Sequence, residues 1–196
     1  LFSDHNQMVN EVAFSPDKMW LASASDDFNV RLWDLESGTI RLPLLIHPAA
    51  VNSVVYNKDG TQLLSSSDDG IVRLWDVASS DVVQEFDHGG LVVHRAVFNP
   101  DNSWVATAVS DGSVYIWTVA GELVQQIVAH DLPVHDLAFN QQGTYLATAS
   151  DDGSAHLWDV TGEVAEYLRT FTGHAGPDLG VSFNRYGSRL ATSSND

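Results

Sequence analysis

The 196-residue chain contains no cysteine and only nine basic residues. Without cysteine, disulfides, thiolate zinc sites and thiol catalysis are all excluded. Nucleic-acid binders cluster Lys and Arg to displace counterions, so nine basic residues against 26 acidic ones argue against binding to nucleic acid or to an anionic membrane. The formal net charge of -17 instead suits a protein or peptide partner of basic character.

Long apolar runs are also missing, and no charged-then-apolar leader opens the chain. We therefore expect a soluble, cytoplasmic protein. Because the sequence starts at Leu1 rather than at a methionine, we expect it to be covalently linked to the remainder of a longer chain.

One 12-residue stretch of the sequence is repeated along the chain. Residues 23–34 read SASDDFNVRLWD, and 65–76, 107–118 and 148–159 repeat this pattern. Trp33, Trp75, Trp117 and Trp158 are separated by 42, 42 and 41 residues. A fixed period of this size indicates a repeat architecture. We place the repeats at about 4–45, 46–86, 87–128 and 129–171, with a truncated fifth at 172–196.

Each period predicts four strands, because short β-branched and aromatic runs alternate with turns rich in Gly, Pro, Asn and Asp. Strands such as VRLW are apolar on nearly every residue, so stacked copies must cover both faces of each sheet. The predicted strands are 9–15, 20–25, 29–33 and 40–46; 51–56, 62–67, 71–75 and 82–86; 92–98, 103–108, 113–117 and 122–128; 134–139, 144–149, 154–158 and 165–171; and 179–183 and 188–193.

The repeats resemble those of the WD-repeat (WD40) family, which builds β-propellers. The matching marks are Trp33-Asp34, Trp75-Asp76 and Trp158-Asp159, together with a histidine near the head of each period. The resemblance covers residues 4–196 and implies an all-β fold. We expect four complete four-stranded repeats plus the truncated fifth, as part of a ring of about seven blades.

Each full period carries a His, a Ser or Thr, an Asp and a Trp, which could be read as a hydrolase triad. The set recurs in every period, Thr replaces Ser, and no strained nucleophile turn is present, so we expect no catalytic residues and no enzyme. The resemblance implies that the residues form buried hydrogen-bonded tetrads. These are His5, Ser23, Asp27 and Trp33; His47, Ser65, Asp69 and Trp75; His88, Thr107, Asp111 and Trp117; and His130, Thr148, Asp152 and Trp158.

Metal sites and cofactors are not expected. Adjacent carboxylates such as Asp68-Asp69 lack the further oxygen ligands of a calcium loop, and His130 and His135 have no third zinc ligand at a recognisable spacing. No glycine-rich phosphate loop is present either. Aromatic residues at the start of the second strands, Trp20, Trp104 and Tyr145, are expected to pack across strands.

The resemblance also implies a partner-binding face, formed by the loops that enter each first strand and the turn after each second strand. The corresponding positions mix apolar, acidic and histidine side chains, which suits a partner with an apolar anchor and a basic flank. They are Met8, Asn10 and Asp26; Ala50, Asn52 and Asp68; Val92, His94 and Ser110; Pro133, His135 and Asp151; and Pro177, Leu179 and Asn195.

Two functions remain open from the sequence. The first is a non-enzymatic scaffold that binds protein or peptide partners. The alternative is a sensor or autoinhibitory module of a larger signalling protein that carries a nucleotide-binding switch domain. A Walker-type phosphate loop in flanking sequence would distinguish the second from the first.

Overall fold

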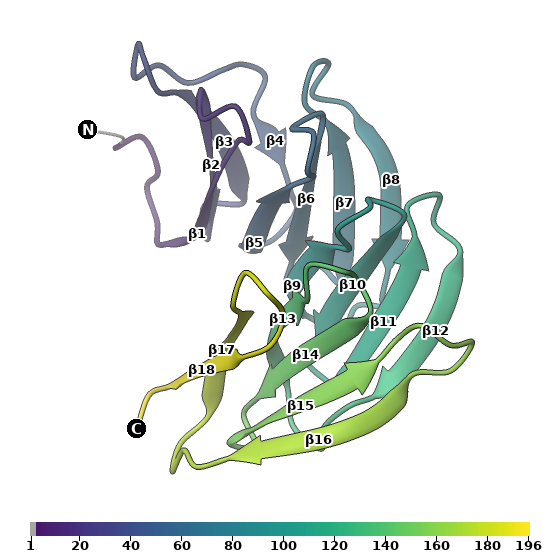
Figure 1. The fold of residues 1–196 in the computed structure, drawn as a ribbon. Helices are drawn as coiled ribbons and strands as arrows, with labels where there is room; N and C mark the ends of the chain where they lie inside the picture. The colour runs from purple at the N-terminus through teal and green to yellow at the C-terminus, as the bar shows by residue number, and fades with distance from the viewer. Residues whose placement is uncertain (1–2) are drawn as a thin grey trace. The chain divides into compact units, whose positions relative to one another are not determined.

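The computed structural model describes residues 3–196, apart from the side chains of Asp178 and Leu179, and this part consists of strands and turns (Figure 1). It holds no helix of a length and apolarity that could cross a bilayer. The chain divides into two compact units, residues 1–96 and residues 97–196. The expected all-β fold is confirmed.

The first unit contains two antiparallel four-stranded sheets, each formed by consecutive strands in chain order (Figure 1). The first comprises β1 (Val9–Phe14), β2 (Trp20–Ser25), β3 (Asn29–Asp34) and β4 (Leu45–Ile46). The second comprises β5 (Val51–Tyr56), β6 (Gln62–Ser67), β7 (Ile71–Asp76) and β8 (Val82–Asp87).

The third sheet runs in the order β12-β11-β10-β9, and its strand β9 contains the boundary between the two units. Its strands are β9 (Val93–Phe98), β10 (Trp104–Val109), β11 (Ser113–Thr118) and β12 (Leu123–Val128). The fourth comprises β13 (Val134–Phe139), β14 (Tyr145–Ser150), β15 (Ser154–Asp159) and β16 (Glu166–Thr172). A two-stranded sheet follows, with β17 (Asp178–Phe183) and β18 (Leu190–Ser194).

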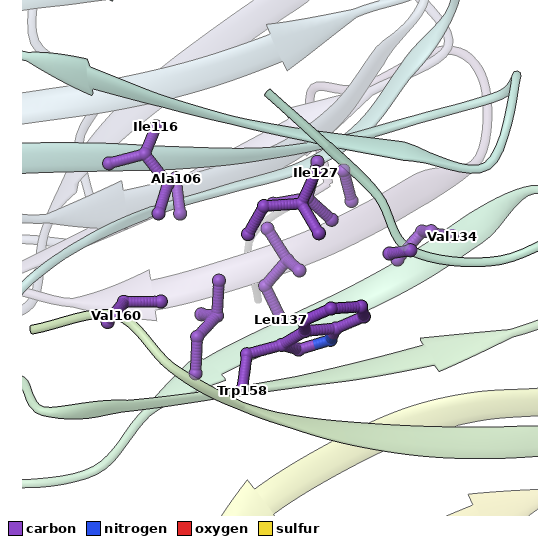
Figure 2. Packing of buried hydrophobic residues seen from close by; sticks show 11 residues of the cluster. Ala106, Ile116, Ile127, Val134, Leu137, Trp158 and Val160 are labelled. Carbon is purple, nitrogen blue, oxygen red and sulfur yellow. The ribbon is translucent and has the colours of Figure 1, made fainter. Parts of the chain in front are cut away.

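Both cores form where neighbouring sheets face each other. In the second unit, Ile116 and Ala106 of the third sheet pack with Leu137 and Trp158 of the fourth, as Figure 2 shows. In the first unit, Leu32 of the first sheet and Val54 of the second belong to one buried cluster. Within each unit, these sheets thus bury apolar faces against a neighbouring repeat, as the doubly apolar strands predict.

Strand β4 is shorter than the predicted strand 40–46. Only Leu45 and Ile46 pair with β3, while Ile40 forms an isolated bridge to Trp33. The chain between them contains Pro43, which has no N–H to donate and therefore interrupts the ladder.

The tight turn between the second and third strands places the paired acidic residues of the first, second and fourth repeats at the end of their sheets. In the second repeat, Gly70 has a φ of +83°, and a Cβ there would lie 2.7 Å from the Cα of Gly90. Glycine is therefore required for both conformation and space. Phe28 takes this position in the first repeat, with a φ of 70° and 44% of its surface exposed.

Candidate functional site

In the first repeat, the four tetrad residues form one hydrogen-bonded chain. The Trp33 indole N–H donates to Ser23 Oγ at 2.8 Å, and Ser23 Oγ lies 2.7 Å from His5 Nε2. His5 Nδ1 lies 2.8 Å from Asp27 Oδ2.

The fourth repeat has the same connections. Thr148 Oγ1 lies 2.7 Å from His130 Nε2, and His130 Nδ1 lies 2.8 Å from Asp152 Oδ2. The Trp158 indole reaches Thr148 at 3.4 Å. The pKa of His130 is lowered by burial, against the raising effect of Asp152, so the imidazole is held neutral at neutral pH.

Two arginines, which the sequence interpretation did not include, join the tetrads in the first and second repeats. Arg73 Nη1 donates to Asp69 Oδ2 at 2.7 Å and lies 2.7 Å from His47 Nδ1, so it stands between these two tetrad residues. Arg31 likewise contacts Asp27 and His5. Both arginines lie two residues before the repeat tryptophan, but this shared position alone does not indicate burial beside a histidine.

These buried charges shift the pKa values of their partners. Burial alone would raise the pKa of Asp27, but hydrogen bonds from His5 and Arg31 outweigh it and lower that pKa strongly. Burial and the neighbouring Arg73 charge lower the pKa of His47 to about 3. At neutral pH Asp27 is therefore ionised and His47 is neutral.

The set of the third repeat spans the two units, so its contacts are given within each unit. The His88 ring lies 3.2 Å from the Gly70 carbonyl in the first unit, and Thr107 donates to the Tyr115 carbonyl at 3.4 Å in the second. Asp111 accepts from the Ser113 N–H. The third repeat is also the one with an additional residue after its histidine.

A further set in the fifth repeat was not singled out from the sequence. His174 lies 3.1 Å from both Thr192 Oγ1 and Asp196 Oδ1. The spacings of 18 and 22 residues match those in the first and fourth repeats, so periodicity alone could have identified it.

The serines of the first two tetrads are poorly placed for nucleophilic attack. Ser23 and Ser65 are 3% and 0% exposed, and each accepts an indole N–H. A nucleophile needs access to substrate, whereas these hydroxyls are enclosed and hydrogen-bonded. The tetrads therefore have a structural role, because their hydrogen bonds pair polar groups that would be costly to bury without partners.

The outer candidate positions form a second recurring arrangement. Asn10 donates to Asp26 Oδ1 at 2.8 Å, and Asn52 donates to Asp68 Oδ1 at 2.8 Å. The same amides reach the following repeat, at the carbonyls of Val51 and Val93 respectively. In the second unit, His135 Nε2 lies 2.8 Å from Asp151 Oδ1.

A β-bulge in each of these first strands explains the arrangement. The register shifts between Val9 and Glu11, between Val51 and Ser53, and between Val134 and Asp136. The extra residue of each bulge is Asn10, Asn52 or His135. Bulges redirect a side chain locally, and here they accompany its contact with the acidic residue of the turn.

Comparison with known families agrees with this repeat geometry. The family described as WD domain, G-beta repeat matches residues 1–34, 38–76, 80–118, 121–159 and 165–196. The chain belongs to the WD-repeat family. WD-repeat proteins typically act as scaffolds for protein interactions.

Curated WD-repeat relatives match over short stretches. The human WD repeat-containing protein 36 is 51% identical over 39 residues, or 20% of this chain and 4% of the relative. The Notchless protein homolog of Arabidopsis thaliana is 63% identical over 30 residues, or 15% of this chain and 6% of the relative. The Ribosome biogenesis protein ERB1 of Debaryomyces hansenii is 40% identical over 38 residues, or 19% and 5%. The matches thus span only a small part of each relative.

The remaining candidate positions of this WD-repeat chain vary in exposure. Met8 is 66% exposed, whereas Ala50 and Val92 are half-buried. The side chain of Leu179 lies outside the described residues. The candidate positions from Met8 through His94 belong to the first unit, and those from Ser110 through Asn195 belong to the second. His94, Ser110, Pro133 and Pro177 are half-buried, and Asn195 is exposed.

Within the part of the chain that the structure describes, no three His, Asp or Glu side chains converge to hold a metal ion. The WD-repeat tetrads combine one His and one Asp with hydroxyl and indole groups, and these atoms already bond to one another.

Proposed function

We propose that this WD-repeat chain is a non-enzymatic interaction module that binds a basic protein or peptide through the acidic turns of its first unit. The observation that carries this proposal is the repeated Asn–Asp pair, Asn10 with Asp26 and Asn52 with Asp68. Both pairs lie at exposed sheet ends, and both use the amide to hold one carboxylate oxygen.

The pairs favour binding because the carboxylates are preorganised. An acidic side chain whose orientation is already restricted loses less rotamer freedom when a partner arrives. The backbone N–H groups of Asp26 and Asp68 also bond to the carbonyls of Met8 and Ala50, which fixes each turn against the loop before its first strand. A basic segment that meets both turns would gain complementary charge at low entropic cost.

Apolar surface accompanies these acidic turns. Met8 is 66% exposed at the loop that bonds to Asp26, and Leu91 is 36% exposed in the loop before β9. Flexible methionine side chains adapt to apolar partners. We therefore propose a partner segment with a basic flank and an apolar anchor.

The test is selection from a displayed peptide library, followed by affinity measurement with the chosen synthetic peptides. We expect the selected peptides to be basic and to contain an apolar residue. Asp26→Asn combined with Asp68→Asn should weaken the binding of these peptides about 5- to 10-fold. The matched control is Glu36→Gln combined with Asp81→Asn, which removes two negative charges from exposed connections elsewhere in the same unit. Equal affinity for both double variants would contradict the proposal.

A further inference from the structure

A hollow of about 330 Å³ lies at the end of β2 away from Asp26, in the first unit. It is lined by the turn between β1 and β2, the turn between β5 and β6, and the residues that follow β7. The side chains that matter here are Asp17, Trp20, Arg41, Tyr56, Asp59 and Asp76.

Tyr56 is the most informative of these side chains. It is only 8% exposed, and its hydroxyl has no hydrogen-bond partner within the described residues. Leaving a buried hydroxyl unpaired costs about 1–3 kcal/mol. Every other repeat has phenylalanine at this position, so packing alone does not require the hydroxyl; these residues are Phe14, Phe98, Phe139 and Phe183.

Three carboxylates surround the hollow. Asp17 accepts hydrogen bonds from Ser15 and Met19, and Asp76 accepts one from Ser79, so their bonds come from their own turns. Asp59 is exposed at the turn between β5 and β6. Each of these groups retains acceptor capacity toward the hollow, because a carboxylate has two oxygens and about four lone-pair sites.

One cation already lies among the carboxylates. The Arg41 guanidinium sits 5.7 Å from the centroid of the Trp20 ring and donates to the Ala78 carbonyl. It neutralises only one of the three negative charges. The hollow therefore keeps an excess of negative charge next to an aromatic ring, which is an environment that attracts a second organic cation.

The equivalent hollow in the second unit provides an internal comparison. Its volume is about 280 Å³, and it is also lined by a tryptophan and an aspartate, Trp104 and Asp101. There, Gln142 occupies the position of Asp59, and phenylalanine occupies that of Tyr56. The Asp59 carboxylate and the Tyr56 hydroxyl thus occur together in the first-unit hollow, and its second-unit counterpart has neither.

We propose that the hollow lined by Asp17, Trp20, Tyr56 and Asp59 binds an arginine side chain of a protein partner. The guanidinium donates to the free carboxylate oxygens, and the Tyr56 oxygen accepts one of its N–H groups. A planar guanidinium suits this site, because it donates in several directions and stacks on aromatic rings. This site lies beyond the proposed binding surface at Asp26 and Asp68, since β2 separates the two.

The test uses N-acetyl-arginine amide as the probe and N-acetyl-citrulline amide as its uncharged counterpart. Binding is followed by the NMR shift of the Trp20 indole N–H in the full chain. We expect arginine to shift this resonance in a saturable way, the lysine analogue to bind more weakly, and citrulline not to bind. Equal shifts from arginine and citrulline would overturn the proposal.

Two variants separate binding from folding. Tyr56→Phe removes the unpaired hydroxyl, so we expect unchanged or higher stability and about threefold weaker arginine binding. Asp59→Gln introduces the residue of the other hollow and should weaken binding about fivefold. Asp101→Asn is the matched control in the second unit and should leave the Trp20 titration unchanged. If Tyr56→Phe and Asp59→Gln bind arginine as well as the wild type, or if Asp101→Asn weakens binding equally, the proposal is wrong.

Discussion

At the scale of single residues, the repeated histidines act as neutral links in buried polar chains. His47 is 2% exposed, and its ring contacts Ser65 on one side and Arg73 on the other. The sequence predicted the histidine, serine, aspartate and tryptophan of this set from their spacing. It gave no direct indication that Arg73 stands beside the histidine, because an arginine in a strand is usually exposed.

The first prediction concerns pH and His47. Its pKa falls from 6.5 to about 3 on folding, so below pH 6.5 the unfolded chain binds a proton that the folded chain does not. Stability attributable to this group is therefore complete above pH 6.5 and declines as the pH falls toward 3. We expect a loss of about 2 kcal/mol between pH 7 and pH 5 from this residue.

The measurement is urea unfolding at both pH values, followed by tryptophan fluorescence. His47→Asn should lower stability at pH 7 but should lose about 2 kcal/mol less than the wild type on acidification. His135→Asn is the control, since it removes a half-buried imidazole whose Nε2 lies 2.8 Å from Asp151 Oδ1 in the second unit. The same acid loss in His47→Asn as in the wild type would show that this histidine does not titrate as described.

At the scale of strands, the sequence predicted the succession of four strands and tight turns, but not the bulges. A bulge depends on which backbone groups remain unpaired at a sheet edge, and alternation of side chains does not reveal this. Glu11 follows the first bulge and accepts the Val54 N–H of the next repeat at 2.9 Å. Asp136 does the same for Val181 in the second unit, also at 2.9 Å.

The second prediction is that Glu11 protects the edge strand β5. Glu11→Ala would leave the Val54 N–H without its acceptor and would remove the ion pair between Glu11 and Arg95. We expect a loss of about 1–3 kcal/mol and faster hydrogen exchange at the Val54 amide. Glu11→Gln keeps an acceptor oxygen and should preserve most of the Val54 protection. Glu36→Ala, on an exposed connection, is the control, and unchanged exchange at Val54 in Glu11→Ala would refute the role.

At the scale of the whole chain, the repeat period predicted the family and the all-β fold, but not the division into two units. The absence of cysteine, the excess of acid and the period of about 42 residues lead to an acidic WD-repeat chain. The boundary between the two compact units, in contrast, lies between Ala96 and Val97 within β9. No proline- or glycine-rich linker marks this boundary, so no local sequence signal predicted it.

The last prediction follows from the formal charge of -17. Most of the 26 acidic residues have no basic counterpart among nine, so the folded chain concentrates mutual repulsion that the unfolded chain relieves. Salt shortens the range of this repulsion, from about 10 Å at 0.1 M to about 3 Å at 1 M. We therefore expect the free energy of unfolding to rise by about 1 kcal/mol between 0.05 M and 0.5 M sodium chloride.

Urea unfolding at these salt concentrations measures the effect. Glu36→Gln combined with Asp81→Asn should show a smaller salt dependence, because two repelling charges have been removed from exposed connections. The competing contribution comes from buried ion pairs such as Arg73–Asp69, whose attraction salt would weaken. These buried pairs are largely shielded from ions, so salt should weaken their attraction less than it weakens the surface repulsion. A net decrease in the free energy of unfolding with salt would show that attraction outweighs repulsion in this chain.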